Sequence, residues 1–299
     1  MEKKKDIMKA NTEEIRYFED KLSKEEMLEI AEKNKTRAFG LISGITSKFS
    51  NDNQDIKLLK IVKRLDPFWE IVAESSIDYE RTSKYKVIVS KEVKKLRIGN
   101  KEFETEESRK NDNTVYLKST DICNKTRKRG MLIDATVLVK DPNHLKHNEK
   151  YESYLTESSK KVKKIEDLEK KDIIISSVNI KASFILRSVL QEIIHLVDAD
   201  KILNEKIEIE KLSLHFRPSY IFEYENTKKK TKGYVSIDSI TGKVSFVKEI
   251  ESKKSKQPLT ETAVFDIGVS AFSSLIPGGE AAYRLVKGIS KERRLRKNK

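Results

Sequence analysis

The eleven residues from Phe68 to Asp78, FWEIVAESSID, carry the pattern on which the fold prediction rests. Apolar side chains such as Trp69 and Ile71 alternate there with acidic ones. Because successive side chains of a strand point to opposite faces, this alternation predicts a half-buried β-strand. Residues 85–89 and 93–98, joined by a short polar turn, are predicted as the next strands.

The same pattern recurs at a constant spacing of 151 residues. Lys60, Leu65, Pro67, Trp69, Ile71 and Glu74 correspond to Lys211, Phe216, Pro218, Tyr220, Phe222 and Glu225. Apolar residues at helical spacing precede each copy, over residues 24–49 and 182–203, and indicate two amphipathic helices. The repeat therefore predicts two homologous units, each a helix followed by an antiparallel meander. The alternative is that two ordinary strands before turns resemble one another by chance.

Two capping-box patterns stand near the N-terminus. Asn11 is followed by Glu14 at the third position, and Ser23 by Glu26. Such pairs satisfy the free backbone N–H groups at the start of a helix, so helices are predicted to begin near residues 12 and 24.

The segment between the two units has mixed composition. Residues 114–118, 131–139 and 172–180 are β-branched and predict further strands. Residues 140–171 are dominated by Lys, Glu, Asn, Ser and Tyr, so they predict a solvated insertion that contains at most one polar helix.

The C-terminal end combines an apolar segment with a basic one. Residues 264–275 and 281–289 have apolar helical spacing and flank the turn Pro277-Gly278-Gly279, which predicts a helical hairpin. The tail KERRLRKNK follows it. The hairpin could dock on the protein's own core, pack in an oligomer, or lie at a membrane interface with the tail on anionic head groups.

These elements together predict an α+β protein with two helix-plus-antiparallel-meander units and a C-terminal helical hairpin. The expected divisions are residues 1–118 for the first unit, 119–176 for the strand pair and charged insertion, 177–250 for the second unit, and 251–299 for the linker, hairpin and tail.

The second unit also carries a recognisable turn. Residues 233–244 read GYVSIDSITGKV, and residues 217–224, RPSYIFEY, stand just before them. Asp238 and Thr241 can accept backbone N–H bonds in the turn, and Gly242 permits a positive φ. This unit resembles the PepSY family over residues 182–247, with a second copy at 24–98. The resemblance implies a cystatin-like α+β module used for binding or inhibition, without catalytic residues of its own.

Composition excludes several classes of protein. The chain has 299 residues and a net charge of +14, and its hydrophobic content of 37% is too low for a polytopic membrane protein. One cysteine and four histidines provide neither a disulfide scaffold nor a zinc module. No secretory signal is visible, so a cytoplasmic location, peripheral at the membrane, is expected. Four basic segments contain more positive charge than the chain's net excess: 124–129, 228–232, 253–256 and 291–299.

Catalytic signatures are weak. Glu192 and His195 have Glu-x-x-His spacing, but the second copy that a di-iron bundle needs is missing. Cys123 lies among cations that favour a thiolate, and a partly buried spectator role is the alternative. No cofactor or metal is expected.

The predicted function is that of a non-enzymatic interaction protein, which binds a protein or membrane-surface partner through its sheets and C-terminal hairpin. One alternative is nucleic-acid binding through basic loops. The other is a metal-dependent hydrolase or nuclease with its site among Asp66, Asp78, Glu80 and Arg81. The candidate interaction residues are Trp69, Tyr220, Phe272, Leu275, Arg293, Arg294 and Arg296.

Overall fold

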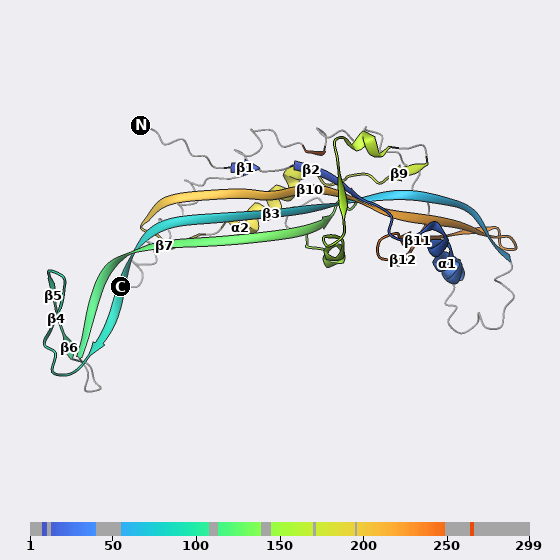
Figure 1. Cartoon of the computed structure of the whole chain (residues 1–299). Helices are drawn as coiled ribbons and strands as arrows, with labels where there is room; N and C mark the ends of the chain where they lie inside the picture. The colour runs from blue at the N-terminus through green and yellow to red at the C-terminus, as the bar shows by residue number, and fades with distance from the viewer. Residues whose placement is uncertain are drawn as a thin grey trace.

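The computed structural model describes residues 8–10, 13–39, 55–107, 113–138, 145–169, 172–194, 196–248 and 264–265. Its centre is an antiparallel pair of long strands, β3 (Ile56–Val89) and β10 (Lys201–Asn226). On the other side of β3 lies β7 (Asn113–Asp134), and on the other side of β10 lies β11 (Thr231–Asp238). β3 and β10 run side by side along most of the molecule, with β7 beside one end of this pair and β11 beside the other (Figure 1).

Shorter elements complete the described fold. The strands are β1 (Met8–Ala10), β2 (Glu13–Phe18), β4 (Lys95–Ile98), β5 (Lys101–Glu104), β6 (Glu106–Glu107), β8 (Ser159–Val162), β9 (Ile173–Ile175) and β12 (Val244–Val247). The α-helices are α1 (Lys24–Asn34) and α2 (Ala182–Ile193), and the 3₁₀ helices are η1 (Lys35–Phe39), η4 (Glu149–Tyr154) and η5 (Ile165–Leu168). Among the described helices, none has both the length and the apolar character needed to cross a membrane.

The strand register follows the repeat in the sequence. Asp66 pairs with Arg217, and these two residues are also 151 positions apart. Leu65 pairs with Pro218, as Phe216 pairs with Pro67. An approximate twofold axis therefore passes through the Asp66–Arg217 pair, and rotation about it superimposes β3 on β10.

The neighbouring elements obey the same relation. The β3–β7 pairing begins at Phe68 and the β10–β11 pairing at Ser219, again 151 positions apart. β9 adds to β3 in parallel at residues 63–65, and β2 adds to β10 in parallel at residues 212–216. The order β2-α1-β3-β7 thus matches β9-α2-β10-β11. Each unit's first strand and helix contact the other unit, because β2 pairs with β10, α1 packs on β11, β9 pairs with β3 and α2 packs on β3 and β7.

Both helices cover one face of the central sheet. The even-numbered side chains of β10, which share a face, enter both helix-side clusters: Leu212, Leu214 and Phe216 pack with α2, and Tyr220, Phe222 and Tyr224 pack with α1. The opposite face holds a third cluster around Phe68, with Phe18, Leu132, Tyr151 and Tyr154. The middle of β3 is buried on both faces, which explains its run of apolar and aromatic residues.

The α+β prediction is wrong, because the described chain is mainly a large mixed sheet. The helix predicted near residue 12 is the strand β2, whereas the helix predicted at residue 24 is confirmed with its Ser23–Glu26 capping box. The first helix is shorter than predicted, since α1 ends at Asn34 and residues 40–54 lie outside the described chain. The second ends at Ile193, and Leu196 beyond it is exposed.

Two pairs of predicted strands are single strands. Residues 68–78 and 85–89 both belong to β3. Residues 114–118 belong to β7, together with the first four residues of the strand predicted at 131–139, since β7 ends at Asp134. The linking residues are polar, but their backbones pair with each other across the two strands. A two-stranded ribbon without a core beneath it has no buried face, so the alternation that reveals strands disappears there.

The charged insertion is more ordered than its composition suggests. It contains η4, β8 and η5, and η4 buries Tyr151 and Tyr154 against the sheet. The predicted C-terminal hairpin lies outside the described residues, apart from Val264 and Phe265. Both are buried, and the ring of Phe265 meets Trp69 edge-on at 5.3 Å between centroids.

Candidate binding site on the projecting arm

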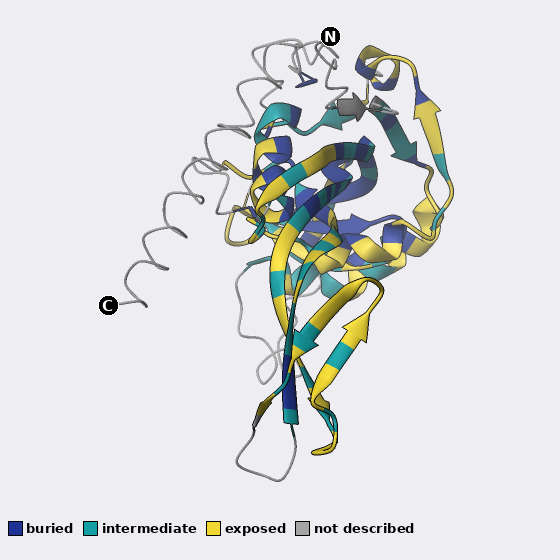
Figure 2. Cartoon of the chain, turned by 90° about the vertical axis from the view of Figure 1, so that its left-hand side faces the viewer, coloured by how far each residue is buried: buried dark blue, intermediate teal, exposed yellow. Residues whose placement is uncertain are grey.

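β3 and β7 continue beyond the end of β10 as a two-stranded ribbon. The last pair shared with β10 is Glu80 with Lys201, and the ribbon runs from the Arg81–Asp121 pair to the Val89–Asn113 pair. We call residues 81–107 and 113–121 the arm; it curves away from the body in Figure 1, with β4 and β5 at its end. Figure 2 shows that buried residues gather in the body, whereas the β4–β5 hairpin is mostly exposed.

On one face of the arm, several side chains donate hydrogen bonds to a single carboxylate, that of Asp121. Asp121 accepts hydrogen bonds from Ser83 Oγ, Ser119 Oγ (2.9 Å), Tyr85 Oη (3.0 Å) and Arg81 Nε (3.3 Å). These bonds, that of Ser83 foremost, outweigh burial and lower the pKa of Asp121 to about 2. The carboxylate is therefore ionised at neutral pH and balances Arg81, so this face carries no net charge from the pair.

The opposite face of the arm carries three lysines. Lys84 lies directly across from Lys118, and Lys86 across from Tyr116. The three lysines are exposed, and we call them, with Tyr116, the lysine face. Lys84 Nζ stands 4.0 Å from the centre of the Tyr116 ring, which is a cation–π contact.

Within the described chain, none of the lysines of the lysine face forms an ion pair. Their strand neighbours on the same face are the uncharged Thr82, Thr120, Ile88 and Thr114, and the carboxylates of Glu80 and Glu106 lie beyond these. Like charges directly opposite each other on paired strands are unfavourable. The arrangement destabilises the free ribbon slightly and would become favourable with an anionic partner.

In each of the two basic segments that the structure describes, two of the four cations are ion-paired. In the segment 124–129, Lys128 pairs with Glu210 at 2.5 Å and Arg129 with Glu192 at 2.6 Å. In the segment 228–232, the partners are Asp55 for Lys228 and Glu223 for Lys232, each at 2.6 Å. The segments 253–256 and 291–299 lie outside the described residues.

The end of the arm is charged but paired. Across the β4–β5 hairpin, Lys95 pairs with Glu104 at 2.9 Å and Arg97 with Glu102 at 2.5 Å. Gly99 turns this hairpin at a positive φ of 57°, which a side chain would disfavour. Ile98 beside it is 49% exposed, so the tip also presents apolar surface.

The candidate interaction residues predicted from sequence do not gather at one place. Trp69 is fully buried and donates from Nε1 to the carbonyl of Ile180 at 2.8 Å. Tyr220 is buried in the α1 cluster and donates to Asp20 Oδ2 at 2.8 Å. Both are core residues rather than parts of a groove. The remaining candidates lie outside the described residues: Phe272, Leu275, Arg293, Arg294 and Arg296.

The proposed acidic active site is not assembled either. Asp66 and Asp78 are twelve positions apart on the one strand β3, a separation of roughly 40 Å at strand rise. Asp78 is held by Asn124 at 2.6 Å and Asn204 at 3.3 Å. Across the described residues, no group of three or more His, Cys, Asp or Glu side chains could hold a metal ion. Cys123 is partly exposed, and His195 lies outside the described chain.

Asp66 instead belongs to a closed network at the approximate twofold. Arg217 contacts Asp238 at 2.8 Å and Asp66 at 3.6 Å, and Tyr154 donates to Asp238. Burial opposes the charge of Arg217, but its acidic and phenolic neighbours outweigh burial and raise its pKa. Burial and the bond to Asp238 raise the pKa of Tyr154 to about 12. The charges of these groups compensate one another, so the network stabilises the fold, although Arg217 Nε has no hydrogen-bond partner among the described residues.

A second buried contact lies beside this network. His215 Nε2 is 2.8 Å from Glu70 Oε2, and the imidazole lies beside the rings of Phe18 and Phe68, at 5.6 and 5.0 Å between centroids. Burial lowers the pKa of His215, although Glu70 opposes the shift. The side chains are 4% and 8% exposed, so substrate has no direct access to the pair.

Comparison with protein-family models, curated proteins and solved structures finds no match to this chain. The lysine face is the candidate binding surface that the arm presents. Sequence reasoning missed it because Lys84 and Lys86 are separated from Lys118 by a long stretch of chain. The Lys-x-Lys alternation at 84–86 is the signal that could have revealed one half of it.

Proposed function

We propose that the protein is a nucleic-acid-binding protein that grips a duplex with the lysine face of its arm. The observation that carries this proposal is the set of three exposed, uncompensated lysines on one side of a projecting ribbon. Lysine ammonium groups bind phosphates and release condensed counterions, which provides most of the affinity in such complexes.

The shape of the arm also supports a duplex ligand. The major groove of B-DNA, about 12 Å wide, admits a two-stranded β-ribbon. Beyond the Glu80–Lys201 pair the arm has no third strand on the β10 side, so β3 and β7 could enter together.

The test compares two triple variants of the full chain. K84Q/K86Q/K118Q removes the lysine face, while K95Q/R97Q/K128Q removes three cations that are already paired with glutamates. Fluorescence anisotropy with a 20-base-pair duplex is measured over a series of salt concentrations. If each lysine contacts one phosphate, the first variant should reduce the slope of log K against log salt by about 2.7. The second should bind almost as the unaltered protein does.

Two outcomes would overturn the proposal. One is an equal loss in both variants, which would show only a general charge effect. The other is binding of anionic lipid vesicles, but not the duplex, through the same three lysines. Vesicle binding is worth measuring because Ile88 and Ile98, near the tip of the arm, are exposed and apolar.

A further inference from the structure

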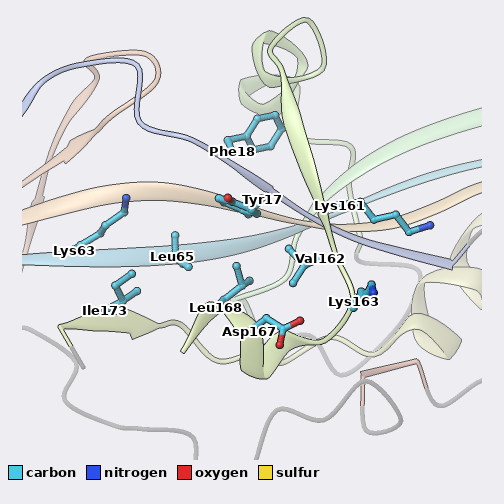
Figure 3. A pocket seen from close by; sticks show the side chains of 10 residues that line it. All are labelled: Tyr17, Phe18, Lys63, Leu65, Lys161, Val162, Lys163, Asp167, Leu168 and Ile173. Carbon is cyan, nitrogen blue, oxygen red and sulfur yellow. The ribbon is translucent and has the colours of Figure 1, made fainter. Parts of the chain in front are cut away.

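We propose that a pocket at the centre of the helix-covered face binds a small amphiphilic carboxylate. This central pocket has a volume of about 370 Å³ and lies between β2, β3, β8, η5 and β9. That volume falls within the range of roughly 300–1,000 Å³ that is usual for small-molecule sites. Its lining residues are Tyr17, Phe18, Lys63, Leu65, Lys161, Val162, Lys163, Asp167, Leu168 and Ile173 (Figure 3).

The symmetry of the fold accounts for the hollow. α1 packs on β11, and α2 packs on β3 and β7, so the two helices cover opposite ends of the sheet. No residue of either helix lines the pocket. Near the approximate twofold axis, this part of the sheet is extended by two short strands instead: β8 pairs with β2, and β9 pairs with β3. These narrow elements leave a space that a helix would fill.

The middle of the pocket is apolar and firmly held. Leu65, Val162 and Leu168 are all at least nine-tenths buried, and they belong to the main hydrophobic cluster. In Figure 3 they lie between Lys63 at one end and Lys161, Lys163 and Asp167 at the other. A hydrocarbon or aromatic body therefore has an apolar surface to cover in the middle of the site.

Lysines outnumber carboxylates among the lining side chains. The lining contains three lysines and one carboxylate, that of Asp167. This carboxylate already accepts a hydrogen bond from the backbone N–H of Lys164 at the start of η5. At the opposite end Lys63 is bound to Asp20 at 2.5 Å. Lys161 shares only an exposed pair with Glu14, at 3.1 Å.

Two groups in the described chain are available to a ligand. Lys163 has no ion-pair partner there, and the hydroxyl of Tyr17 has no hydrogen-bond partner there. A carboxylate at the Lys161–Lys163 end, with its apolar body along Leu65, would complement the site. This site is independent of the arm and of the function proposed for it.

The experiment is calorimetric titration of the full chain with octanoate, using 1-octanol and octylamine as neutral and cationic analogues. Octanoate should bind saturably and octylamine should not, and octanol should bind more weakly than octanoate. K161Q/K163Q should weaken octanoate by about fivefold, since partly exposed ion pairs contribute modestly, and should leave octanol unchanged. K160Q/K164Q is the matched control, because it removes two cations from the same segment that do not line the pocket.

A variant that fills the pocket with a larger side chain distinguishes binding in the pocket from binding to the surface around it. Ile173→Trp should abolish binding of both octanoate and octanol, and a thermal melt shows whether the variant still folds. The proposal is overturned if octanoate gives no saturable heat at millimolar concentration. It is overturned equally if K160Q/K164Q weakens octanoate as much as K161Q/K163Q does.

Discussion

Arg217 sits where the two units meet, and two carboxylates that are almost fully buried depend on it. Asp66 is 4% exposed and Asp238 is 5% exposed. Asp66 has a second cation in Arg64 at 2.8 Å, whereas Asp238 is otherwise held by the neutral Tyr154 hydroxyl and by backbone N–H groups. Arg217→Met should therefore lower the free energy of unfolding by about 3–5 kcal/mol, the usual result of leaving a buried charge unpaired. Urea denaturation of the variant and the unaltered protein measures this change in the free energy of unfolding.

Two further variants make this prediction specific. Arg217→Lys keeps the charge but loses the planar fork, so it should destabilise the protein less than Arg217→Met. Arg81→Met removes an exposed arginine from the arm and should have little effect. If Arg217→Met proves as mild as Arg81→Met, the network does not stabilise the fold.

The lowered pKa of Asp134 predicts how the stability of the protein depends on pH. Burial alone would raise its pKa, but bonds from Thr136, Tyr151 and Lys150 outweigh burial and lower the pKa to about 2, from 3.8. Between those values the unfolded chain binds more protons than the folded chain, so stability falls as pH falls. Asp134→Asn should be less stable than the unaltered protein at pH 7, and the difference should shrink from pH 4 towards pH 2. A constant difference in urea unfolding at each pH would contradict this prediction.

At the scale of elements, one glycine decides how closely η1 packs on β11. A Cβ at Gly233 would lie 3.0 Å from both Ala38 Cβ and the Ala38 carbonyl oxygen, and 3.0 Å from Phe39 Cζ. Gly233→Ala should thus push η1 away and lower the free energy of unfolding by about 1–3 kcal/mol. Gly130→Ala, in β7, is the matched control, since its nearest contact is 3.8 Å from Val72 Cγ2. It should be neutral or slightly stabilising, and equal effects in urea denaturation would refute the packing argument.

Local signals predicted some elements and not others. Ser23 and Glu26 predicted α1 because the reciprocal bonds of a capping box are local. Asn11 and Glu14 matched the same spacing, yet Glu14 lies in β2, which is held by pairing with β10 far along the chain. Long-range pairing overrode the local preference, and no sequence window contains that information.

The candidate site illustrates the same limit. Composition located the basic segments 124–129 and 228–232, but not the glutamates and aspartate that neutralise four of their cations. The lysine face depends on register, because Lys84 meets Lys118 only through the β3–β7 pairing. A register is set by the turn and by the whole hydrophobic pattern, so it could not be read from either strand alone.

For the molecule as a whole, the exchange of elements between the two units predicts that neither folds alone. In the first unit α1 would lose β11 and β3 would lose β10, while in the second α2 would lose the hairpin of β3 and β7. Each unit would also expose a long unpaired strand, which favours aggregation over folding. The chain can be divided after residue 140, between β7 and η4.

Fragments 1–140 and 141–299 should therefore show no cooperative thermal transition when studied separately. Mixed, they should form a one-to-one complex that unfolds in one transition, because the β3–β10 pairing joins all three hydrophobic clusters. Circular dichroism and size-exclusion chromatography measure both properties, and fluorescence of the single Trp69 reports burial in the complex. Cooperative unfolding of either fragment by itself would show that a unit is autonomous. The contacts between units would then be a docking interface rather than the core of one fold.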